Sequence, residues 1–489
     1  MSEMKSPKKT LILGGMWAVG TRWAIRGIGL LNTVIMARLV LPADYGIVAM
    51  AYLVVALIQA LTDFGATTAL MRKKEVTRDE IDSAWTLRII QGVVVGLLIL
   101  MASPFASMYF NEPRVKYVLW TLAVCVAIAG LGNIGTTLAQ KEFNFSLEFR
   151  LNVIGKIVGV IGTVTAGYIL RDYRALVIGI SGSYVAGVVL SYYMHPYRAR
   201  WNTTKIGEIW ALTKWLMFAG VGGFILRKGD ELIAARIGST SDYGLYNVGS
   251  DFGQMPTGEV GPAMLRALMP VLASLKGNAS EINAAVIKTL SAITTITFPI
   301  GLGFAAIAVP ATVLVLGPHW ENAAQYVGAF ALLSTFQIIQ NPVSTLLIVR
   351  GHTTTQSMAV WIEFSIFLLA ALLLVPHLFL MGLVWARMMG TIANIAVNFA
   401  MAKKHCDFPL GQSVAALFRP AIGSLIMYYI VQEAMRSSST IVYQLAIGIA
   451  IGAVFFAIWC ALTWRIFGKP DGLEATVFAG LASSKFFKS

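Results

Sequence analysis

Long apolar segments, separated by short polar stretches, follow one another along almost the whole chain. A helix that crosses the hydrocarbon core of a membrane needs about 20 mostly apolar residues. Hydropathy, with glycine, proline and charged residues as boundaries, predicts fourteen such segments, of which 243–273 is the least apolar. Their expected limits are 11–37, 46–70, 84–108, 115–138, 148–170, 174–194, 210–236, 243–273, 283–316, 323–349, 355–376, 379–402, 414–434 and 440–466.

The composition supports an all-α integral membrane protein. Hydrophobic residues make up 57% of the 489 residues and charged residues only 13%, whereas soluble domains carry about 25% charged residues. The apolar stretch after Lys5, Lys8 and Lys9 contains two arginines and no cleavage site follows it, so we expect a retained first helix rather than a signal peptide. The three cysteines are too far apart for a disulfide framework or a metal site, and we expect neither a metal nor a cofactor.

The positive charge has a membrane explanation. The net charge is +14, and cytoplasmic loops of membrane proteins are enriched in Lys and Arg, so we expect no nucleic-acid partner. If the N-terminus lies inside, most basic residues fall in inside loops, including the run Arg72, Lys73 and Lys74. This bias predicts an even number of spans, with both termini in the cytoplasm.

A short pattern near the start of the chain recurs in its middle. Residues 37–47 and 235–245 share Ala-Arg at the start and Asp-Tyr-Gly near the end, and each copy lies between the first two spans of a six-span unit. Six is an even number, so the two units should be related by an axis along the membrane normal, with substrate bound between them. A turn motif that recurs by coincidence is the alternative. Within each copy, we expect the Asp and Arg residues to be structural: Arg38, Asp44, Arg236 and Asp242.

The duplication divides the chain into three parts. We expect residues 1–200 to form a first six-helix lobe and residues 201–405 to form a second. Residues 406–489 should add two further helices and a cytoplasmic tail.

Charged residues inside apolar segments are the first candidates for function, because they are costly at membrane depth. Arg22 and Arg26 project from one face of the first span and have no acidic residue within four positions. They require an acidic neighbour such as Asp63, a water-filled cavity or an anionic ligand. Lys156 is isolated in the fifth span, with only Asn152 as a polar neighbour. We expect these cations to line a cavity that accepts phosphate, which Arg binds through two oxygens at once.

The seventh span carries a denser group of charges. Arg227 is three and four positions before Asp230 and Glu231, so these residues can form their own ion pairs. Lys228 is expected on another face and is the better ligand candidate. The segment 243–273 is too polar and too interrupted by proline to face lipid, and should border the cavity with Arg266. The remaining acids either bind a coupling cation or neutralise the arginines: Asp63, Asp251, Glu259 and Glu363.

Several motifs resemble those of a known family. ARLVLPADYGIVAM at 37–50, Asp63-Phe64-Gly65 with Arg72, and Gln140-Lys141-Glu142-Phe143 are similar to polysaccharide exporters of the Wzx-type flippase group, especially the colanic-acid and succinoglycan branch. The resemblance implies a superfamily that includes multidrug exporters and the lipid II flippase, two six-helix lobes and alternating access. It implies transport of undecaprenyl-pyrophosphate-linked oligosaccharide across the bacterial inner membrane for exopolysaccharide or lipopolysaccharide synthesis. It also implies basic residues that hold the pyrophosphate, which Arg22 and Arg26 match in kind.

Two other functions remain as alternatives. A small-molecule exporter of the same superfamily would favour cationic drugs and an acidic cavity, and a membrane glycan polymerase or ligase would need a long external loop that this chain lacks. No P-loop pattern occurs, so we expect neither ATP hydrolysis nor enzymatic activity. The expected partners are lipid-linked oligosaccharide, membrane lipids, and a polymerase and chain-length regulator of the same pathway, with the transporter itself a monomer. The sugar and the energy source cannot be deduced from the sequence.

Overall fold

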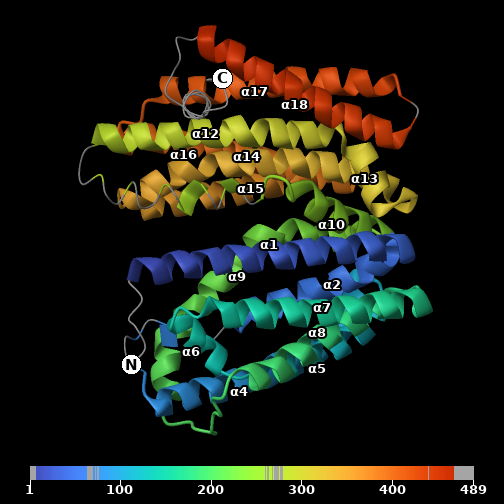
Figure 1. Cartoon of the computed structure of the whole chain (residues 1–489), viewed down its shortest axis with the longest axis vertical. Coiled ribbons are helices and arrows are strands. Elements are labelled where there is room, and N and C mark those ends of the chain that lie inside the picture. Colours follow the sequence, from blue (N-terminus) through green and yellow to red (C-terminus); the bar gives the residue numbers. More distant parts are fainter. Residues whose placement is uncertain are drawn as a thin grey trace, which may run out of the picture. The chain divides into compact units, whose positions relative to one another are not determined.

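The protein folds as two compact units, Met1–Gly244 and Leu245–Ser489 (Figure 1). Every regular element among the described residues of this computed structural model is helical. The division of the chain at residues 200 and 405 stays a prediction. The structure describes residues 7–62, 70–71, 73, 76–258, 260–261, 264–266, 268, 272, 275, 279–438 and 440–466.

The first unit is built from helices that pack in successive pairs. Helix α1 packs on α7, α7 on α8, α8 on α5, and α5 on α4, while α9 lies against α2 and α4. The expected span 115–138 is two helices, α5 and α6, bent by 61° at a break that contains Gly132. The helices of this unit are α1 (Pro7–Leu39), α2 (Pro42–Leu61), α4 (Arg78–Phe110), α5 (Arg114–Gly130), α6 (Gly135–Lys141), α7 (Phe145–Leu170), α8 (Tyr173–Met194), α9 (Ile206–Ile237) and the start of α10 (Thr240–Gln254).

The second unit has its apolar core between α12, α14 and α16. Val286, Val343 and Ala402 are fully buried there, and α17 packs on α12. Helix α18 packs mainly on α17. The elements of this unit are α12 (Ala279–Ala306), α13 (Ala308–Leu316), the 3₁₀ helix η1 (Pro318–Ala323), α14 (Ala324–Val349), α15 (Thr353–Leu378), α16 (Leu380–Cys406), α17 (Leu410–Arg436) and α18 (Ile441–Ile466).

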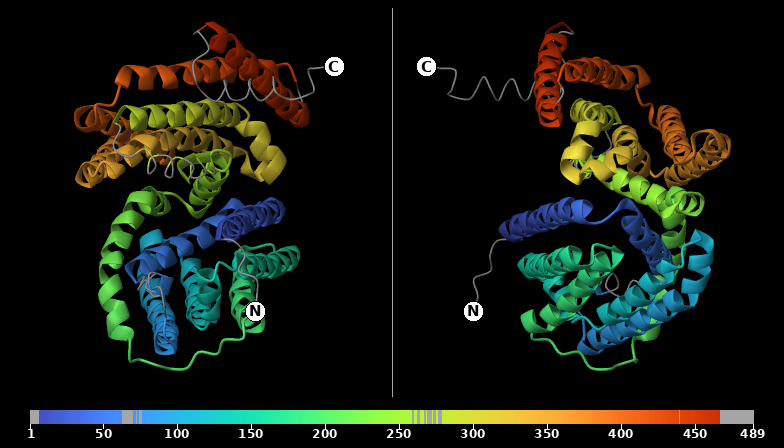
Figure 2. Two further views of the ribbon diagram at one scale, coloured as in Figure 1. Left: turned by 60° about the vertical axis from the view of Figure 1, so that its left-hand side comes forward. Right: turned by 90° about the vertical axis from the view of Figure 1, so that its right-hand side faces the viewer.

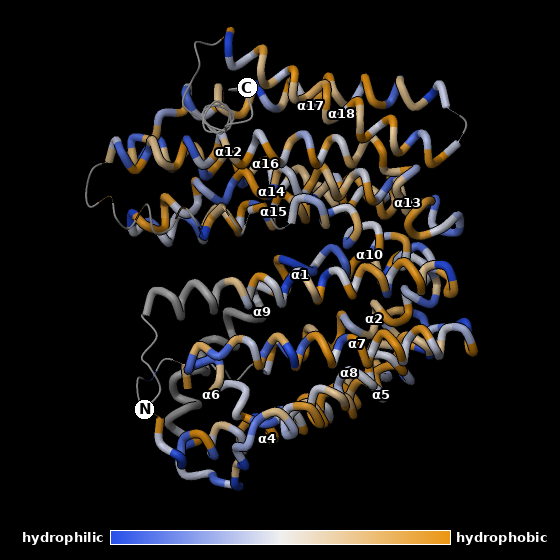
Figure 3. The backbone as a smooth tube through the Cα atoms, viewed as in Figure 1, coloured by the Kyte–Doolittle hydropathy of each residue, from blue (hydrophilic) through white to orange (hydrophobic). Residues whose placement is uncertain are grey.

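The helices have the length and surface of membrane spans, which confirms the predicted fold class. Ten helices among the described residues are long and apolar enough to cross a membrane, or eleven if α5 and α6 form one bent span. Only 11% of the apolar window of α18 is buried, so its hydrophobic side chains require lipid around them. Hydrophobic positions run along these helices in Figure 3. Each expected span coincides, over its described residues, with a helix, a pair of helices or, for 243–273, α10 and short helical pieces; fourteen crossings stay a prediction.

The two copies of the repeated pattern have the same local structure and touch each other. Each is a helix, a tight turn and a second helix: α1 to α2 in one copy and α9 to α10 in the other. A Cβ atom added to Gly46 would lie 1.9 Å from the carbonyl oxygen of Thr240, and one added to Gly244 would lie 1.9 Å from that of Pro42. These pairs occupy equivalent positions of the two copies, so the contact is reciprocal. Reciprocity of this kind is expected of a duplicated unit and not of a coincidental turn motif.

The acidic residues of the repeat have the structural role expected of them. Asp44 Oδ1 accepts a hydrogen bond from the backbone N–H of Tyr173, at 3.2 Å. Asp242 Oδ2 accepts from both the backbone N–H and the hydroxyl of Ser239, at 3.1 and 2.6 Å. Both carboxylates therefore satisfy donors at the ends of helices, where backbone N–H groups have no partner within the helix.

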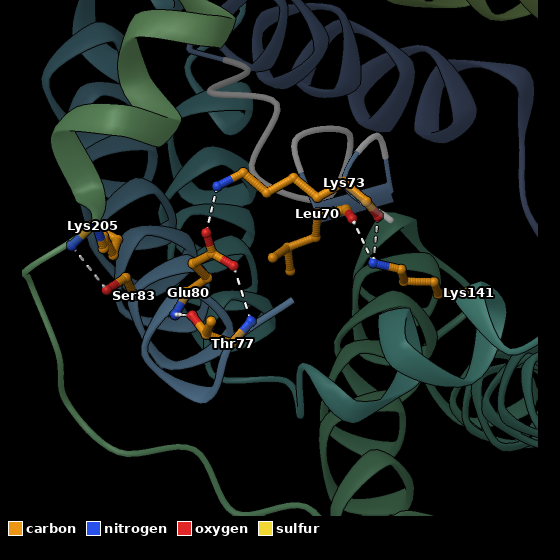
Figure 4. Close-up of polar contacts among 7 residues, drawn as sticks. All are labelled: Leu70, Lys73, Thr77, Glu80, Ser83, Lys141 and Lys205. Atoms are coloured by element: carbon orange, nitrogen blue, oxygen red, sulfur yellow. Dashed lines mark hydrogen bonds and ion pairs between the residues drawn. The ribbon is translucent and has the colours of Figure 1, made fainter. Parts of the chain in front are cut away.

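The start of α4 is a well-defined helix end (Figure 4). Thr77 Oγ1 accepts from the N–H of Glu80 at 3.4 Å, and the Glu80 carboxylate accepts from the N–H of Thr77 at 2.9 Å, which together form a capping box. The same carboxylate forms an ion pair with Lys73, and Lys141 Nζ donates to the carbonyl of Lys73 at 2.6 Å. The segment after α2 is thereby tied to both α4 and α6.

We expect the Thr77→Ala variant to lose about 1 kcal/mol of stability, because the first turn of α4 loses its side-chain acceptor. Thermal unfolding of the purified protein in detergent measures this loss. Thr121→Ala is the matched control, because the exposed Thr121 hydroxyl bonds only to the carbonyl of Tyr117 in its own helix. Equal unfolding midpoints for the two variants would contradict the capping role.

The connection from α8 to α9, residues 195–205, passes round this end of the unit without regular structure and is called the strap (Figure 2). Its Tyr197 hydroxyl donates to Asp82 Oδ1 at 2.8 Å, and burial, reinforced by this bond, raises the pKa of Tyr197 to about 12. The backbone N–H groups of Asn202 and Lys205 donate to the hydroxyls of Thr86 and Ser83 in α4, at 3.0 and 3.3 Å. The strap is therefore bonded to α4 along its length.

Candidate functional site

Three of the predicted cations lie on one face of the α1–α7 pair. Arg22 and Arg26 are four positions apart on α1, and Gly29 is three positions further, so all three positions lie on one face of the helix. Lys156 of α7 reaches that face, since its Cε lies 3.9 Å from the place of a Cβ on Gly29. We call Arg22, Arg26 and Lys156 the α1–α7 cation cluster.

The two helices run in the same direction along this contact. The rings of Trp17 and Phe149 lie 5.0 Å apart near one end, and a Cβ on Gly167 would meet Met36 Sδ at 2.8 Å near the other. Between these points, the cluster contains an exposed Arg22 and half-buried Arg26 and Lys156. The α1–α7 packing thus fixes where the three cations stand.

A group of like charges at this position is costly without an anion. Two unit charges about 6 Å apart, the spacing of neighbours on one helix face, repel by about 3 kcal/mol at an effective dielectric constant of about 20. An anion with several oxygens removes this repulsion, and arginine provides a planar pair of donors for it. The cluster is suited to a phosphate or pyrophosphate group.

The charges of α9 are arranged differently from the prediction. Glu231, only 6% exposed, forms an ion pair with Lys228, and it also accepts a 3.4 Å hydrogen bond from the Tyr243 hydroxyl. The expectation that Lys228 faces away from the acids is therefore wrong, because Lys228 is three positions before Glu231 and shares its face. Arg227 is exposed, and its guanidinium lies against Gly223. Asp230 is 2% exposed. Lys228 has a structural partner that Lys156 lacks.

Glu363 of α15 is bound by neutral donors from α16. Thr391 Oγ1 donates to Glu363 Oε1 at 3.3 Å, and Asn394 Nδ2 donates to Glu363 Oε2. Asn398 in turn donates to the carbonyl of Asn394 at 3.0 Å. The sequence analysis missed these partners, although Asn394 and Asn398 are four positions apart in an apolar helix and so predict a polar stripe. Carboxylate, hydroxyl and amide oxygens in one place are the ligands that hard cations prefer.

The remaining candidates are placed less informatively. Asp251 on α10 and Arg266 in the short helical piece 264–266 are both exposed and belong to the second unit. Asp63 and Glu259 lie outside the described residues. Within the described ranges, no group of three or more His, Cys, Asp or Glu could hold a metal ion.

Comparison with known families decides which class of membrane protein this is. Residues 35–325, more than half of the chain, match the family described as "Polysaccharide biosynthesis protein". The chain belongs to this family. The match begins within α1, just before the first copy of the repeat, and contains the second copy as well.

Relatives of this polysaccharide biosynthesis protein cover almost its whole length. The lipopolysaccharide biosynthesis protein WzxC of Escherichia coli is 21% identical over 91% of this chain and 89% of that protein. The succinoglycan biosynthesis transport protein ExoT of Rhizobium meliloti is 21% identical over 94% of both. An uncharacterised membrane protein in the cps region of Klebsiella pneumoniae is 24% identical over 87% and 86%.

Solved structures show the same fold at low sequence identity. The lipid II flippase MurJ, in an inward closed conformation, matches with a TM-score of 0.72 and 14% identity, over 93% of this chain and 99% of that one. An inward-facing multidrug resistance transporter of the MATE family, in the MOP superfamily, matches with a TM-score of 0.58 and 14% identity over 78% and 94%. This polysaccharide biosynthesis protein is a multi-pass membrane protein with the fold of these transporters.

Proposed function

We propose that this protein is a flippase that moves undecaprenyl-pyrophosphate-linked oligosaccharide from the cytoplasmic to the periplasmic leaflet of a bacterial inner membrane. The α1–α7 cation cluster carries this proposal, because it offers two arginines and a lysine to a pyrophosphate on the surface of one helix pair. The exported unit then enters exopolysaccharide or lipopolysaccharide synthesis. The names of WzxC and ExoT, and the fold shared with MurJ, support this substrate class.

The physical problem of the reaction is the head group. A pyrophosphate with several sugars cannot enter the hydrocarbon core, because its charges and hydroxyls would lose their water. A cluster of cations inside the protein replaces that water for the phosphates, while the polyprenyl chain remains in lipid. Alternating access between two lobes then exposes the same site first to one side and then to the other.

The remaining features of the proposal concern energy and partners. The oxygen-rich group of Glu363, Thr391 and Asn394 is a candidate site for a coupling cation, with charge balance as the alternative role. Both termini are placed in the cytoplasm, since the inside loops carry the basic residues. A polymerase and a chain-length regulator use the exported units, and the transporter acts as a monomer.

A deletion strain tests the proposal. We expect it to lose the cell's polysaccharide and to accumulate lipid-linked repeat units in the cytoplasmic leaflet, and a plasmid copy of the gene should reverse both effects. Thin-layer analysis of extracted lipids before and after periplasmic labelling measures this. Unchanged polysaccharide with new sensitivity to cationic drugs would instead identify a drug exporter. Chain extension of lipid-linked units by the purified protein would identify a polymerase.

A further inference from the structure

The interior of the first unit contains a cavity that the cation cluster does not use. Its volume is about 350 Å³, and α4, the α5–α6 break, α7 and α8 surround it. Figure 1 shows α7 and α8 side by side, and the cavity lies where both helices approach the break. Its lining is mostly polar, which is unusual for the interior of a membrane-embedded lobe.

Several side chains of this lining have no partner within the protein. Gln140, Glu148, Asn152 and Tyr184 all line the cavity, and none of their side chains forms a hydrogen bond with the described residues. A buried amide or carboxylate without a hydrogen bond costs about 1–3 kcal/mol or more. Four such groups around one space indicate a ligand, or water that a ligand displaces.

Arg88 supplies the cationic side of the cavity. Its guanidinium lies at the α5–α6 break, where Nη2 donates a long hydrogen bond of 3.4 Å to the carbonyl of Ala129 and would stand 3.1 Å from a Cβ on Gly132. The carbonyl end of α5 stabilises this cation through the helix dipole. A guanidinium has five N–H donors, so the bond to Ala129 leaves several for a ligand.

The combination of groups selects a neutral ligand rich in hydroxyls. An isolated anion would face Glu148, and an isolated cation would face Arg88, so neither satisfies the whole lining. A hydroxyl donates and accepts at once, and therefore matches the guanidinium, the carboxylate and the two amides together. A sugar ring presents several hydroxyls in a volume that this cavity can contain.

The cavity adjoins the cation cluster along α7. Glu148, Asn152 and Lys156 follow one another at four-residue intervals and form one stripe on the helix. One helical turn, about 5.4 Å, separates the cavity residue Asn152 from the cluster residue Lys156. In a lipid-linked oligosaccharide, the first sugar is bonded directly to the pyrophosphate, so its position must lie this close to the cations.

We propose that this cavity binds the first sugar of the lipid-linked oligosaccharide and thereby sets which oligosaccharides are transported. The assignment rests on the proposed function, because it takes the pyrophosphate to be held by Arg22, Arg26 and Lys156. The cations would bind any such lipid alike, whereas the polar groups of the cavity distinguish one sugar from another.

A cavity-filling variant tests the assignment. Gly187 of α8 lines the cavity, and a Cβ added there would meet no heavy atom within 4 Å, so Gly187→Val fills space without a backbone clash. Gly182→Val is the matched control, because Gly182 lies on the same helix, is equally open and does not line the cavity. Both substitutions change helix propensity in the same way.

Binding is measured with purified protein in nanodiscs. The probes are undecaprenyl pyrophosphate without sugar and the same lipid carrying glucose, galactose or N-acetylglucosamine. We expect the unsubstituted protein to bind at least one sugar-bearing probe about tenfold more tightly than the bare lipid, the gain from two net hydrogen bonds. Gly187→Val should lose that gain and keep its affinity for the bare lipid, while Gly182→Val keeps both. Asn152→Ala should lose part of the gain.

The outcomes separate the two proposals. If the bare lipid binds but the sugars add nothing, or if Gly187→Val retains the gain, the sugar site is wrong and the flippase proposal stands. If none of the four lipids binds to the unsubstituted protein, the proposed function is overturned, and the sugar site with it. Retained affinity for the bare lipid also shows that each variant is folded.

Discussion

Replacing Gly46 by alanine should remove most of the correctly folded protein. The new Cβ would stand 1.9 Å from the carbonyl oxygen of Thr240 and 2.9 Å from its carbonyl carbon, well inside ordinary van der Waals contact. Both atoms belong to the backbone, so α2 or α10 must move as a whole. Overpacking of this kind costs about 3 kcal/mol, which is a large share of the stability of a typical protein.

The measurement is the yield of monodisperse protein after detergent extraction, together with its thermal unfolding midpoint. Gly244→Ala should cause the same loss, because its Cβ would stand 1.9 Å from the carbonyl oxygen of Pro42. Gly20→Ala and Gly27→Ala on α1 are the controls, since a Cβ at either position meets nothing within 4 Å. A Gly46→Ala protein with normal yield and midpoint would show that the two helix ends separate easily.

Replacing both Arg22 and Arg26 by alanine should abolish polysaccharide export while the protein still inserts in the membrane. A hydrogen bond to a charged group contributes about 1.5–3 kcal/mol, and each 1.4 kcal/mol is a factor of ten. Losing one such bond from each arginine lowers transport about 100-fold or more. Polysaccharide output of a deletion strain carrying the variant measures the effect, with immunoblots of the membrane fraction as the check on insertion.

Two further variants sharpen this result. The double Arg→Lys variant keeps both charges but loses the two-pronged geometry of the guanidinium, so we expect an intermediate output. Arg174→Ala is the control, because Arg174 is an exposed arginine at the start of α8 that pairs with Asp172. Normal export by the double alanine variant would remove the cation cluster from the transport mechanism.

The fold was predictable because membrane insertion imposes a strong and local pattern. Segments such as 148–170 and 355–376 coincide with α7 and α15 to within a few residues, since one hydrophobic stretch corresponds to one helix. The break between α5 and α6 was not predicted. Its signal, the glycines at 130, 132 and 135, resembles the many glycines that the chain accommodates within straight helices.

The site was predictable only where charge alone is informative. Arg22, Arg26 and Lys156 stand out in any apolar segment, but their convergence depends on the packing of α1 on α7, which no local pattern contains. The same limit produced the error at Lys228, where two basic neighbours compete for two acids and the choice depends on rotamers. The polar cavity was missed because its residues come from helices far apart in sequence.

The strap makes the junction between the two halves of the duplication an unsuitable place to divide the chain. Asn133, beside the α5–α6 break, donates to the carbonyls of His195 and Tyr197 at 3.1 and 2.9 Å. A fragment that ended at Met194 would lose these acceptors, along with the donors to Thr86 and Ser83. The ancestral halves are thus no longer interchangeable modules. The first has incorporated the linker into its own folded end, so a split version of this transporter needs its break elsewhere.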